Sequence, residues 1–348
     1  MATKFASMIT DSTREILYRD AVNEALRQEM ARDETIIIMG EEISGAAGRD
    51  QFVGAWGGPF RTTGGLFKEF GRERVLDTPI SEAAFMGAAV GAASTGLRPI
   101  AELMFVDFIG VCLDQLTNNA AKMRYMFGGQ VNVPLTVMTR IGAGFGSAAQ
   151  HSESYYSILS HMPGLKGVAP SDAYTAKGLL TAAIRDDDPV IYFEHKGLYG
   201  NMGLAPEEPY ALPLGKARTV LEGSDVTLVG ISRMTLVCVE AARELAALGI
   251  DAEVIDLLSV SPIDYDHVID SVRRTHRLVV VDEDTPICSI ASDICARVAE
   301  EAFDYLDAPP SRVTAPHTPV PYSRALENIY IPNEARIINT VRKLLARG

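Results

Sequence analysis

The feature that most constrains this chain is the alternation of short apolar runs with longer helical segments. In the N-terminal part, runs with the composition of buried strands are followed by stretches with helical periodicity. This alternation is typical of an α/β fold, in which helices cover a mostly parallel sheet. The expected strands are 35–39, segments near Val75 and Ile100, 135–138 and 190–194, and the expected helices are 19–32, 81–95, 107–126 and 172–185.

The C-terminal part repeats the same rhythm. Between residues 199 and 214 the chain has three prolines and little periodicity, as extended linkers do. A chain of 348 residues is long enough for two globular cores. We therefore expect two doubly wound α/β domains, 1–200 and 215–348, joined by a linker at 201–214. The strands expected in the second domain are 226–231, 253–257 and 278–282, and the helices are 236–248 and 289–306.

Composition excludes several classes of protein. A net charge of -13 argues against nucleic-acid binding as a main activity. The most apolar candidate membrane segment, 83–97, is shorter than the ~20 residues that a membrane helix needs. The start of the chain lacks the apolar core of a secretory signal. The four cysteines include no CxxC pair and suit a reducing compartment, so we expect a cytoplasmic protein without a zinc site.

Two segments are rich in glycine. The first, 44–65, also carries the single tryptophan, Trp56, and irregular segments of that length are usually functional or disordered. The tryptophan favours a functional role for this segment over disorder. The second, 142–146, lacks the GxGxxG spacing of a dinucleotide loop and does not clearly open a helix, so it is a weak nucleotide signal.

Glu82 has two interpretations. It stands in the expected first turn of a helix that Ser81 can cap, where the helix dipole favours a negative charge. Alternatively, it is a functional carboxylate at the carboxyl edge of a parallel sheet, where open α/β folds bind ligands. Spacing alone favours the first interpretation.

His151 and two phenylalanines are further candidates. His151 follows the second glycine-rich turn, where it either satisfies a loop backbone or transfers protons near neutral pH, with Glu153 in a position to orient it. Phe105 and Phe108 have the spacing of core residues, although a flat ring could also stack on a heteroaromatic ligand. These residues alone leave the alternatives open.

Several motifs, taken in order, resemble one family. They are Arg74-Val-Leu-Asp-Thr-Pro-Ile-Ser-Glu82, Gly96-Leu-Arg-Pro-Ile-Ala-Glu102, Gln150-His151-Ser152 and Pro163-Gly-Leu165. From about Tyr18 to Leu345 the chain resembles the beta subunits of the decarboxylase components of 2-oxo acid dehydrogenases. The resemblance implies the pyrimidine-binding and C-terminal domains of transketolase, with thiamine diphosphate as cofactor.

The resemblance also implies partners. In this family a separate alpha subunit carries a Gly-Asp-Gly motif that holds Mg²⁺ and the diphosphate, and this chain has no such motif. The implied assembly is an α2β2 heterotetramer in which each cofactor lies across a subunit interface. A lipoyl-bearing acyltransferase core is the implied acceptor of the product group.

Residue roles carried over from the family change the interpretation of the candidates. By motif, Glu82 matches the carboxylate that bonds the cofactor's pyrimidine nitrogen, Phe108 the stacking ring and His151 the active-site histidine. Ile80 and Met104 are further expected cofactor contacts. The resemblance also implies a potassium site, formed mainly by main-chain carbonyl groups of Leu135, Ala183, Ile184, Asp186 and Asp188.

The substrate is less constrained. Segments 55–58, 102–110 and 124–129 look more like acetoin dehydrogenase beta subunits than pyruvate or branched-chain ones. At 59–62 the chain departs from the acetoin-type pattern, and Arg61 there could favour a carboxylate substrate. Two other classes stay open at this point: a nicotinamide-linked dehydrogenase, and a non-catalytic scaffold that shares the fold.

Overall fold

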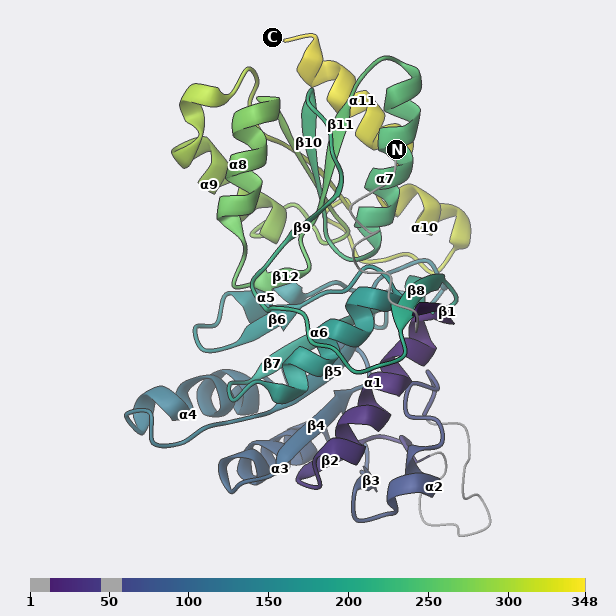
Figure 1. Cartoon of the computed structure of the whole chain (residues 1–348), viewed down its shortest axis with the longest axis vertical. Coiled ribbons are helices and arrows are strands. Elements are labelled where there is room, and N and C mark those ends of the chain that lie inside the picture. Colours follow the sequence, from purple (N-terminus) through teal and green to yellow (C-terminus); the bar gives the residue numbers. More distant parts are fainter. Residues whose placement is uncertain (1–12, 45–57, 348) are drawn as a thin grey trace.

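The computed structural model describes residues 13–44 and 58–347. It contains two α/β units that lie one above the other in Figure 1, each with helices on both faces of a sheet. Trp56 and most of the first glycine-rich segment lie outside the described residues. The α/β prediction with two doubly wound domains is confirmed by this architecture.

The N-terminal unit is built on a seven-stranded sheet with the order β12-β6-β7-β5-β4-β2-β3. Six strands are parallel, and the edge strand β12 pairs antiparallel with β6. The carboxyl ends of the parallel strands therefore meet at one edge. The strands are β2 (Ile36–Gly40), β3 (Val75–Asp77), β4 (Arg98–Leu103), β5 (Thr136–Ile141), β6 (Lys166–Val168), β7 (Val190–His195) and β12 (Ser259–Ser261).

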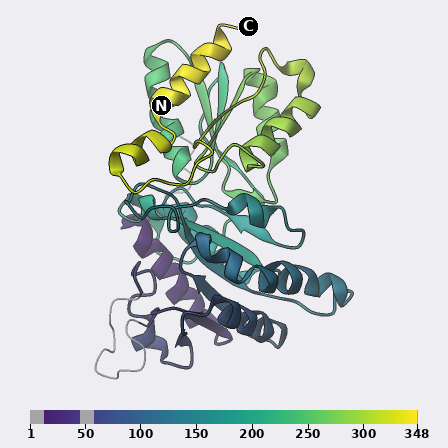
Figure 2. The ribbon, with the colours of Figure 1, turned by 180° about the vertical axis from the view of Figure 1, so that it is seen from behind.

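Helices cover both faces of this sheet. On one face α1 (Tyr18–Arg32) packs along α6 (Ala173–Arg185), as Figure 1 shows, and Tyr18 and Leu26 are buried there. On the other face, seen from behind in Figure 2, lie α3 (Glu82–Ser94) and α4 (Ala121–Met126). Shorter elements are α2 (Leu66–Phe70), the 3-10 helices η3 (Val106–Val111) and η5 (Lys196–Leu198), the π-helix η4 (Gln115–Ala120) and α5 (Tyr156–Ser160).

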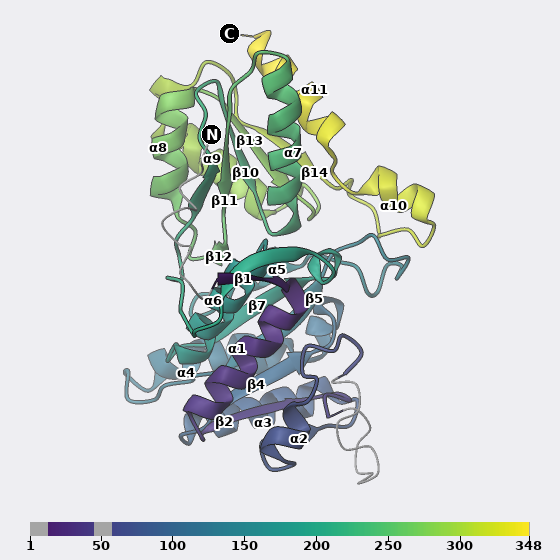
Figure 3. The same ribbon diagram turned by 45° about the vertical axis from the view of Figure 1, so that its right-hand side comes forward.

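The C-terminal unit has a five-stranded sheet with the order β14-β13-β10-β11-β9. Its strands are parallel except for the edge strand β9. The strands are β9 (Arg218–Leu221), β10 (Val226–Gly230), β11 (Ala252–Asp256), β13 (Leu278–Asp282) and β14 (Ser311–Thr314), and the helices are α7 (Arg233–Ala247), α8 (Tyr265–Thr275), α9 (Ile290–Glu301), η6 (Phe303–Tyr305), α10 (Arg324–Tyr330) and α11 (Glu334–Leu345). Figure 3 shows α10 projecting from the body of this unit beside the N-terminal unit.

Three predicted elements differ from the structure. The helix expected at 107–126 begins as the 3-10 helix η3 and continues as the π-helix η4, within which the side chain of Asn119 donates to the carbonyl of Asp114, five residues earlier. The helix expected at 289–306 ends at Glu301. The expected linker begins in a strand, β8 (Met202–Pro206), which pairs antiparallel with β1 (Thr13–Leu17).

Candidate active site

The candidate site lies at the carboxyl edge of the N-terminal sheet. The strand order departs from the chain order at β2, which lies between β3 and β4, and ligands bind at such points in open α/β sheets. Glu41 follows β2, Met104 follows β4 and Lys196 follows β7. Most of the predicted catalytic and cofactor residues are brought to this edge.

Glu82 is the first residue of α3 and is 8% exposed. Ser81 stands at the N-cap, but its side chain makes no capping hydrogen bond, so the predicted capping role of Ser81 was wrong. Burial raises the pKa of Glu41, and the nearby charge of Glu82 raises it further. The carboxyl groups of Glu41 and Glu82 therefore repel each other at this edge. This repulsion costs free energy unless one of the two is protonated or accepts a hydrogen bond.

Two buried side-chain oxygens at this edge, one of them in the Glu41–Glu82 pair, lack a hydrogen-bond partner. They are Oε1 of Glu41 and Oγ1 of Thr78, whose main-chain amide bonds the carbonyl of Gly40 at 2.9 Å. Buried polar atoms are nearly always paired, so unpaired ones in a native fold need an explanation. A polar ligand at the edge would pair them: the hydroxyl of Thr78 can donate to a ring nitrogen, and the carboxylate of Glu41 can accept from an amino group.

A cluster of aromatic rings lies next to this edge. The ring of His151 packs edge-on against Phe105, with centroids 4.6 Å apart, and against Phe108 at 5.3 Å. Phe105 and Phe108 also contact each other, and Phe60 packs on Phe105 at 5.3 Å. The structure thus brings together His151 and Phe108, as the sequence predicted, and adds Phe60 to them.

Glu153 does not orient His151 through any hydrogen bond in the described ranges. Its amide donates to Asp107, and its carbonyl accepts from Gly142. Burial, and then the charge of Asp107, raises the pKa of the Glu153 carboxyl to about 7. The main-chain carbonyl of His151 is held instead by the ammonium of Lys196.

Ile80 and Met104 differ in exposure. Met104 is half-buried after β4, whereas Ile80 is 84% exposed. Ile80 therefore exposes an apolar side chain two residues before Glu82.

Sequence reasoning missed the residues that fix the His151 segment. They are Asp107, Lys196, Glu283 and Glu327, all with side chains directed at main-chain groups of residues 142–153. The signal for Lys196 was present, because it directly follows a buried strand at the ligand-binding edge. Glu283 and Glu327 belong to the C-terminal unit, and no spacing in the sequence links them to this segment.

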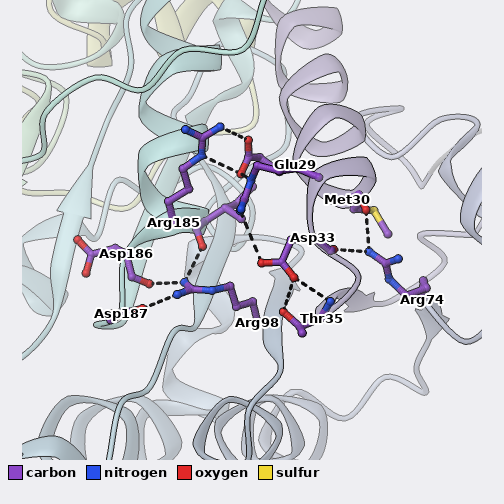
Figure 4. A network of polar contacts seen from close by, with 11 residues as sticks. Glu29, Met30, Asp33, Thr35, Arg74, Arg98, Arg185, Asp186 and Asp187 are labelled. Atoms are coloured by element: carbon purple, nitrogen blue, oxygen red, sulfur yellow. Dashed lines mark hydrogen bonds and ion pairs between the residues drawn. The ribbon is translucent and has the colours of Figure 1, made fainter.

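The predicted potassium site lies at the opposite edge, away from Glu82 and His151. Arg98, which begins β4, donates to the carbonyls of Ile184 and Asp186 at 3.1 and 3.0 Å (Figure 4). The carbonyl of Leu135 accepts from Val190, and that of Ala183 accepts from Asp186. The carboxylate of Asp188 binds Lys166 and Arg124. Within the described ranges no cluster of three or more metal-ligating side chains occurs.

Comparisons with known proteins agree with this geometry. The transketolase pyrimidine-binding domain matches residues 14–202, and the transketolase C-terminal domain matches residues 215–337. A relative named acetoin:2,6-dichlorophenolindophenol oxidoreductase subunit beta, from Bacillus subtilis (strain 168), is 54% identical over 95% of this chain and 98% of its own length. The pyruvate dehydrogenase E1 component subunit beta of Rhizobium meliloti (strain 1021) is 44% identical over 93% of this chain and 68% of its own length.

A solved structure titled split gene transketolase, inactive beta4 tetramer, shares the fold. Its TM-score is 0.76 at 22% identity, and the match covers 95% of this chain and 98% of the other. Fold and site therefore define a transketolase-like chain of the thiamine-diphosphate-dependent enzymes. Within that class, the chain belongs to the family of beta subunits of acetoin dehydrogenase and pyruvate dehydrogenase E1 type, which are oxidoreductase subunits with an alpha-subunit partner. In the described ranges no helix has the length and apolar character needed to cross a membrane.

Proposed function

We propose that this chain is the beta half of an acetoin-cleaving, thiamine-diphosphate-dependent oxidoreductase, and that Glu82 activates the cofactor. The observation that carries the proposal is the placement of Glu82: a buried carboxylate at the carboxyl edge, beside the unpaired oxygens of Glu41 and Thr78. The similarity to the acetoin-type relative, 54% against 44% for the pyruvate-type one, supports acetoin as substrate.

Each residue has a separate role in this proposal. When bound, thiamine diphosphate supplies a nucleophilic thiazolium carbon that attacks a carbonyl group. Glu82 holds a proton between its carboxyl group and the pyrimidine nitrogen, which sets the protonation of the ring. Phe108 offers its ring as a stacking surface, while Ile80 and Met104 provide apolar contact. His151 gives or takes a proton at the substrate oxygen near neutral pH.

The partners follow from what this chain lacks. With no Gly-Asp-Gly motif in its sequence, it leaves the diphosphate and Mg²⁺ to the alpha subunit. We propose an α2β2 heterotetramer with the cofactor at the subunit interface, where the exposed Ile80 would be covered. The product group would then pass to a lipoyl-bearing acyltransferase.

Potassium at the opposite edge is a separate proposal. Main-chain carbonyl oxygens are suitable donors for a hard cation, and each has a second lone pair beyond the hydrogen bond that it accepts. The guanidinium of Arg98 opposes a cation at Ile184 and Asp186. The three neighbouring carboxylates, Asp186, Asp187 and Asp188, are already paired with Lys166, Arg98 and Arg124. Thermal unfolding of the assembled enzyme in KCl and in choline chloride at equal ionic strength tests it. Potassium should raise the transition temperature, and equal temperatures would exclude an occupied site.

The function is tested by co-expression with an alpha subunit. The pair, with thiamine diphosphate and Mg²⁺, should reduce dichlorophenolindophenol with acetoin, and the beta chain alone should not. Pyruvate and branched-chain 2-oxo acids are the alternative substrates, which the exposed Arg61 beside Phe60 would favour. Dye reduction faster with a 2-oxo acid than with acetoin would overturn the substrate assignment.

Glu82→Gln separates an enzyme subunit from a scaffold. The variant should lose most of its activity, by roughly a hundredfold or more, since the ring nitrogen loses its proton partner, and should still assemble. Glu334→Gln is the matched control, because Glu334 is also the first residue of a helix, α11. An equal loss in both variants would point to a helix-dipole role for Glu82.

A further inference from the structure

The loop that carries His151 is closed on itself. This His151 loop, residues 142–153, leaves β5 and is joined at its ends by a hydrogen bond from the amide of Gly142 to the carbonyl of Glu153, at 3.1 Å. A loop with glycine at 142, 144 and 146 has little conformational preference of its own. Something outside the loop must therefore set where its histidine lies.

Three carboxylates from other elements bind the amides of this loop. Glu283, which follows β13, accepts from Ala143 at 2.6 Å. Glu327, in α10, accepts from Gly144 and Gly146 through its two oxygens, at 3.0 and 2.9 Å. Asp107 accepts from Ser152 and Glu153 at 3.2 and 3.3 Å. Hydrogen bonds to a charged acceptor are stronger than neutral ones, and Glu327 is 1% exposed, so little water competes for it.

At the end of the loop that carries His151, the side-chain ammonium of Lys196 binds the main chain. Lys196 donates to the main-chain carbonyl of His151 and is 5% exposed. Its Nζ lies over the rings of Phe105, at 5.0 Å, and Phe145, at 6.0 Å, and Phe105 in turn packs on the His151 ring. Burial lowers the pKa of Lys196 to about 8, while the charges of Asp107, Glu283 and Glu327 oppose that shift. The ammonium is thus attracted by the same three carboxylates that bind the loop, although it forms no ion pair with them in the described ranges.

We propose that Lys196 and Glu327 are positioning residues for His151, and that the C-terminal unit holds the active-site loop through Glu327 of α10. The proposal rests on the proposed function, in which the imidazole of His151 transfers a proton. Lys196 fixes the main chain of His151 from one side, and Glu327 fixes the glycine turn from the other (Figure 3 shows α10 beside the loop that leaves β5). Both residues act through the loop and not on the substrate.

Two substitutions test the proposal in the assembled enzyme. Lys196→Met keeps an apolar stem against Phe105 and Phe145 but removes the donor. Glu327→Gln keeps the shape but turns an amide group toward one of the two glycine amides. We expect kcat to fall by about tenfold or more in Lys196→Met and less in Glu327→Gln, because a misplacement of about 1 Å costs up to a hundredfold. The KM for thiamine diphosphate should stay within about twofold, since neither residue is at Glu82 or Phe108.

The chain offers close controls for both variants. Lys177 is also fully buried, donates to the main-chain carbonyls of Pro206 and Glu207 at 2.7 Å, and lies over the ring of Tyr210 at 5.5 Å, on the far side of the unit. Glu29 is a buried carboxylate that binds Arg185. Lys177→Met and Glu29→Gln should keep kcat per assembled enzyme within about twofold, although they lower stability.

Hydrogen exchange gives a second readout that does not depend on turnover. Amide protection in residues 142–153 should fall in Lys196→Met and Glu327→Gln and stay unchanged in the two controls. Unchanged exchange and kcat in both variants would overturn the proposal. If the unsubstituted assembly has no acetoin activity, the proposed function fails, whereas the exchange experiment still decides whether these residues hold the loop.

Discussion

The ring of Phe60 packs edge-on against the ring of Phe105, with centroids 5.3 Å apart and planes at 80°. Phe105 carries the contact on to the ring of His151 at 4.6 Å. The guanidinium of Arg140, a fully buried residue of β5, lies over the Phe60 ring at 4.6 Å and also holds it in place. Residue 60, where the chain departs from the acetoin-type pattern, is therefore joined to the candidate site by two ring contacts, whereas its neighbour Arg61 is exposed.

Phe60→Ala should widen the substrate range. Removing the ring frees space next to Phe105 without touching His151, so larger acyloins should gain in kcat/KM relative to acetoin by roughly tenfold. Phe70→Ala is the control, because Phe70 also has an arginine, Arg74, over its ring at 5.5 Å but lies in α2, away from His151. A substrate panel on the assembled enzyme measures the ratio, and an unchanged ratio would remove Phe60 from the pocket.

Arg140→Met should be among the most destabilising single substitutions. Arg140 binds Glu102 at 2.8 Å and lies 3.6 Å from Glu194, and all three side chains are at most 3% exposed. Without the guanidinium two carboxyl groups are left buried together, a change that costs about 3 to 5 kcal/mol. Arg243→Met, in an exposed pair with Glu240, should change stability by less than about 0.5 kcal/mol. Thermal unfolding of the two variants should separate them by several degrees.

The fold could be predicted because its signal is local. The buried strands β2 and β13 are almost continuous apolar runs, and each lies close to where the sequence places it. The strand pairs that were missed depend on distant partners: β1 with β8, and β12 with β6. Pairings between segments so far apart leave no periodic trace in either one.

The site divides in the same way. Glu82, Phe108 and His151 follow from motifs in which the chemical residue is part of the pattern. No motif indicates the residues that hold the His151 loop, because Glu283 and Glu327 are more than a hundred positions from the amides that they bind. The structure also shows that Arg98, a motif residue, occupies two carbonyl groups assigned to potassium.

Acidification should stabilise the junction between the two units. Burial raises the pKa of Asp282 to about 6 and that of Asp284 to about 7, and the nearby Glu153 also titrates near 7. These groups bind protons more tightly in the folded than in the unfolded chain. Their contribution to stability is therefore complete below the unfolded pKa of about 4 and is lost as the pH rises through 6 to 7.

Asp284→Asn tests this pH dependence. Asp284 accepts a hydrogen bond from Ser157 at 2.6 Å across the junction. The variant should show a smaller drop in transition temperature between pH 5 and pH 8 than the unsubstituted protein, because one of the titrating groups is gone. Asp270→Asn, in an exposed pair with Arg273, should leave the slope as it was. Parallel slopes for all three proteins would contradict the assignment.

Gly142→Ala should lower the free energy of unfolding by more than the positive φ of Gly142 alone explains. Gly142 has a φ of +95°, and a Cβ added there would lie 2.1 Å from Nε2 of His195. That nitrogen donates to Glu283 at 2.9 Å, because Nδ1 of the same ring accepts from Gly197. The added methyl group must therefore displace His195 from Glu283, which also holds the amide of Ala143.

Gly71→Ala isolates the conformational part of that cost. Gly71 has a φ of +76° with nothing within 4 Å of an added Cβ, so this variant should lose only about 1 kcal/mol and keep its activity. Gly142→Ala should lose more stability and, because the start of the His151 loop moves with Glu283, at least tenfold in kcat. Thermal unfolding and dye reduction on the same preparations measure both effects. Equal losses in the two variants would mean that the contact between Gly142 and His195 is unimportant and that the loop is set by Glu327 and Lys196 without it.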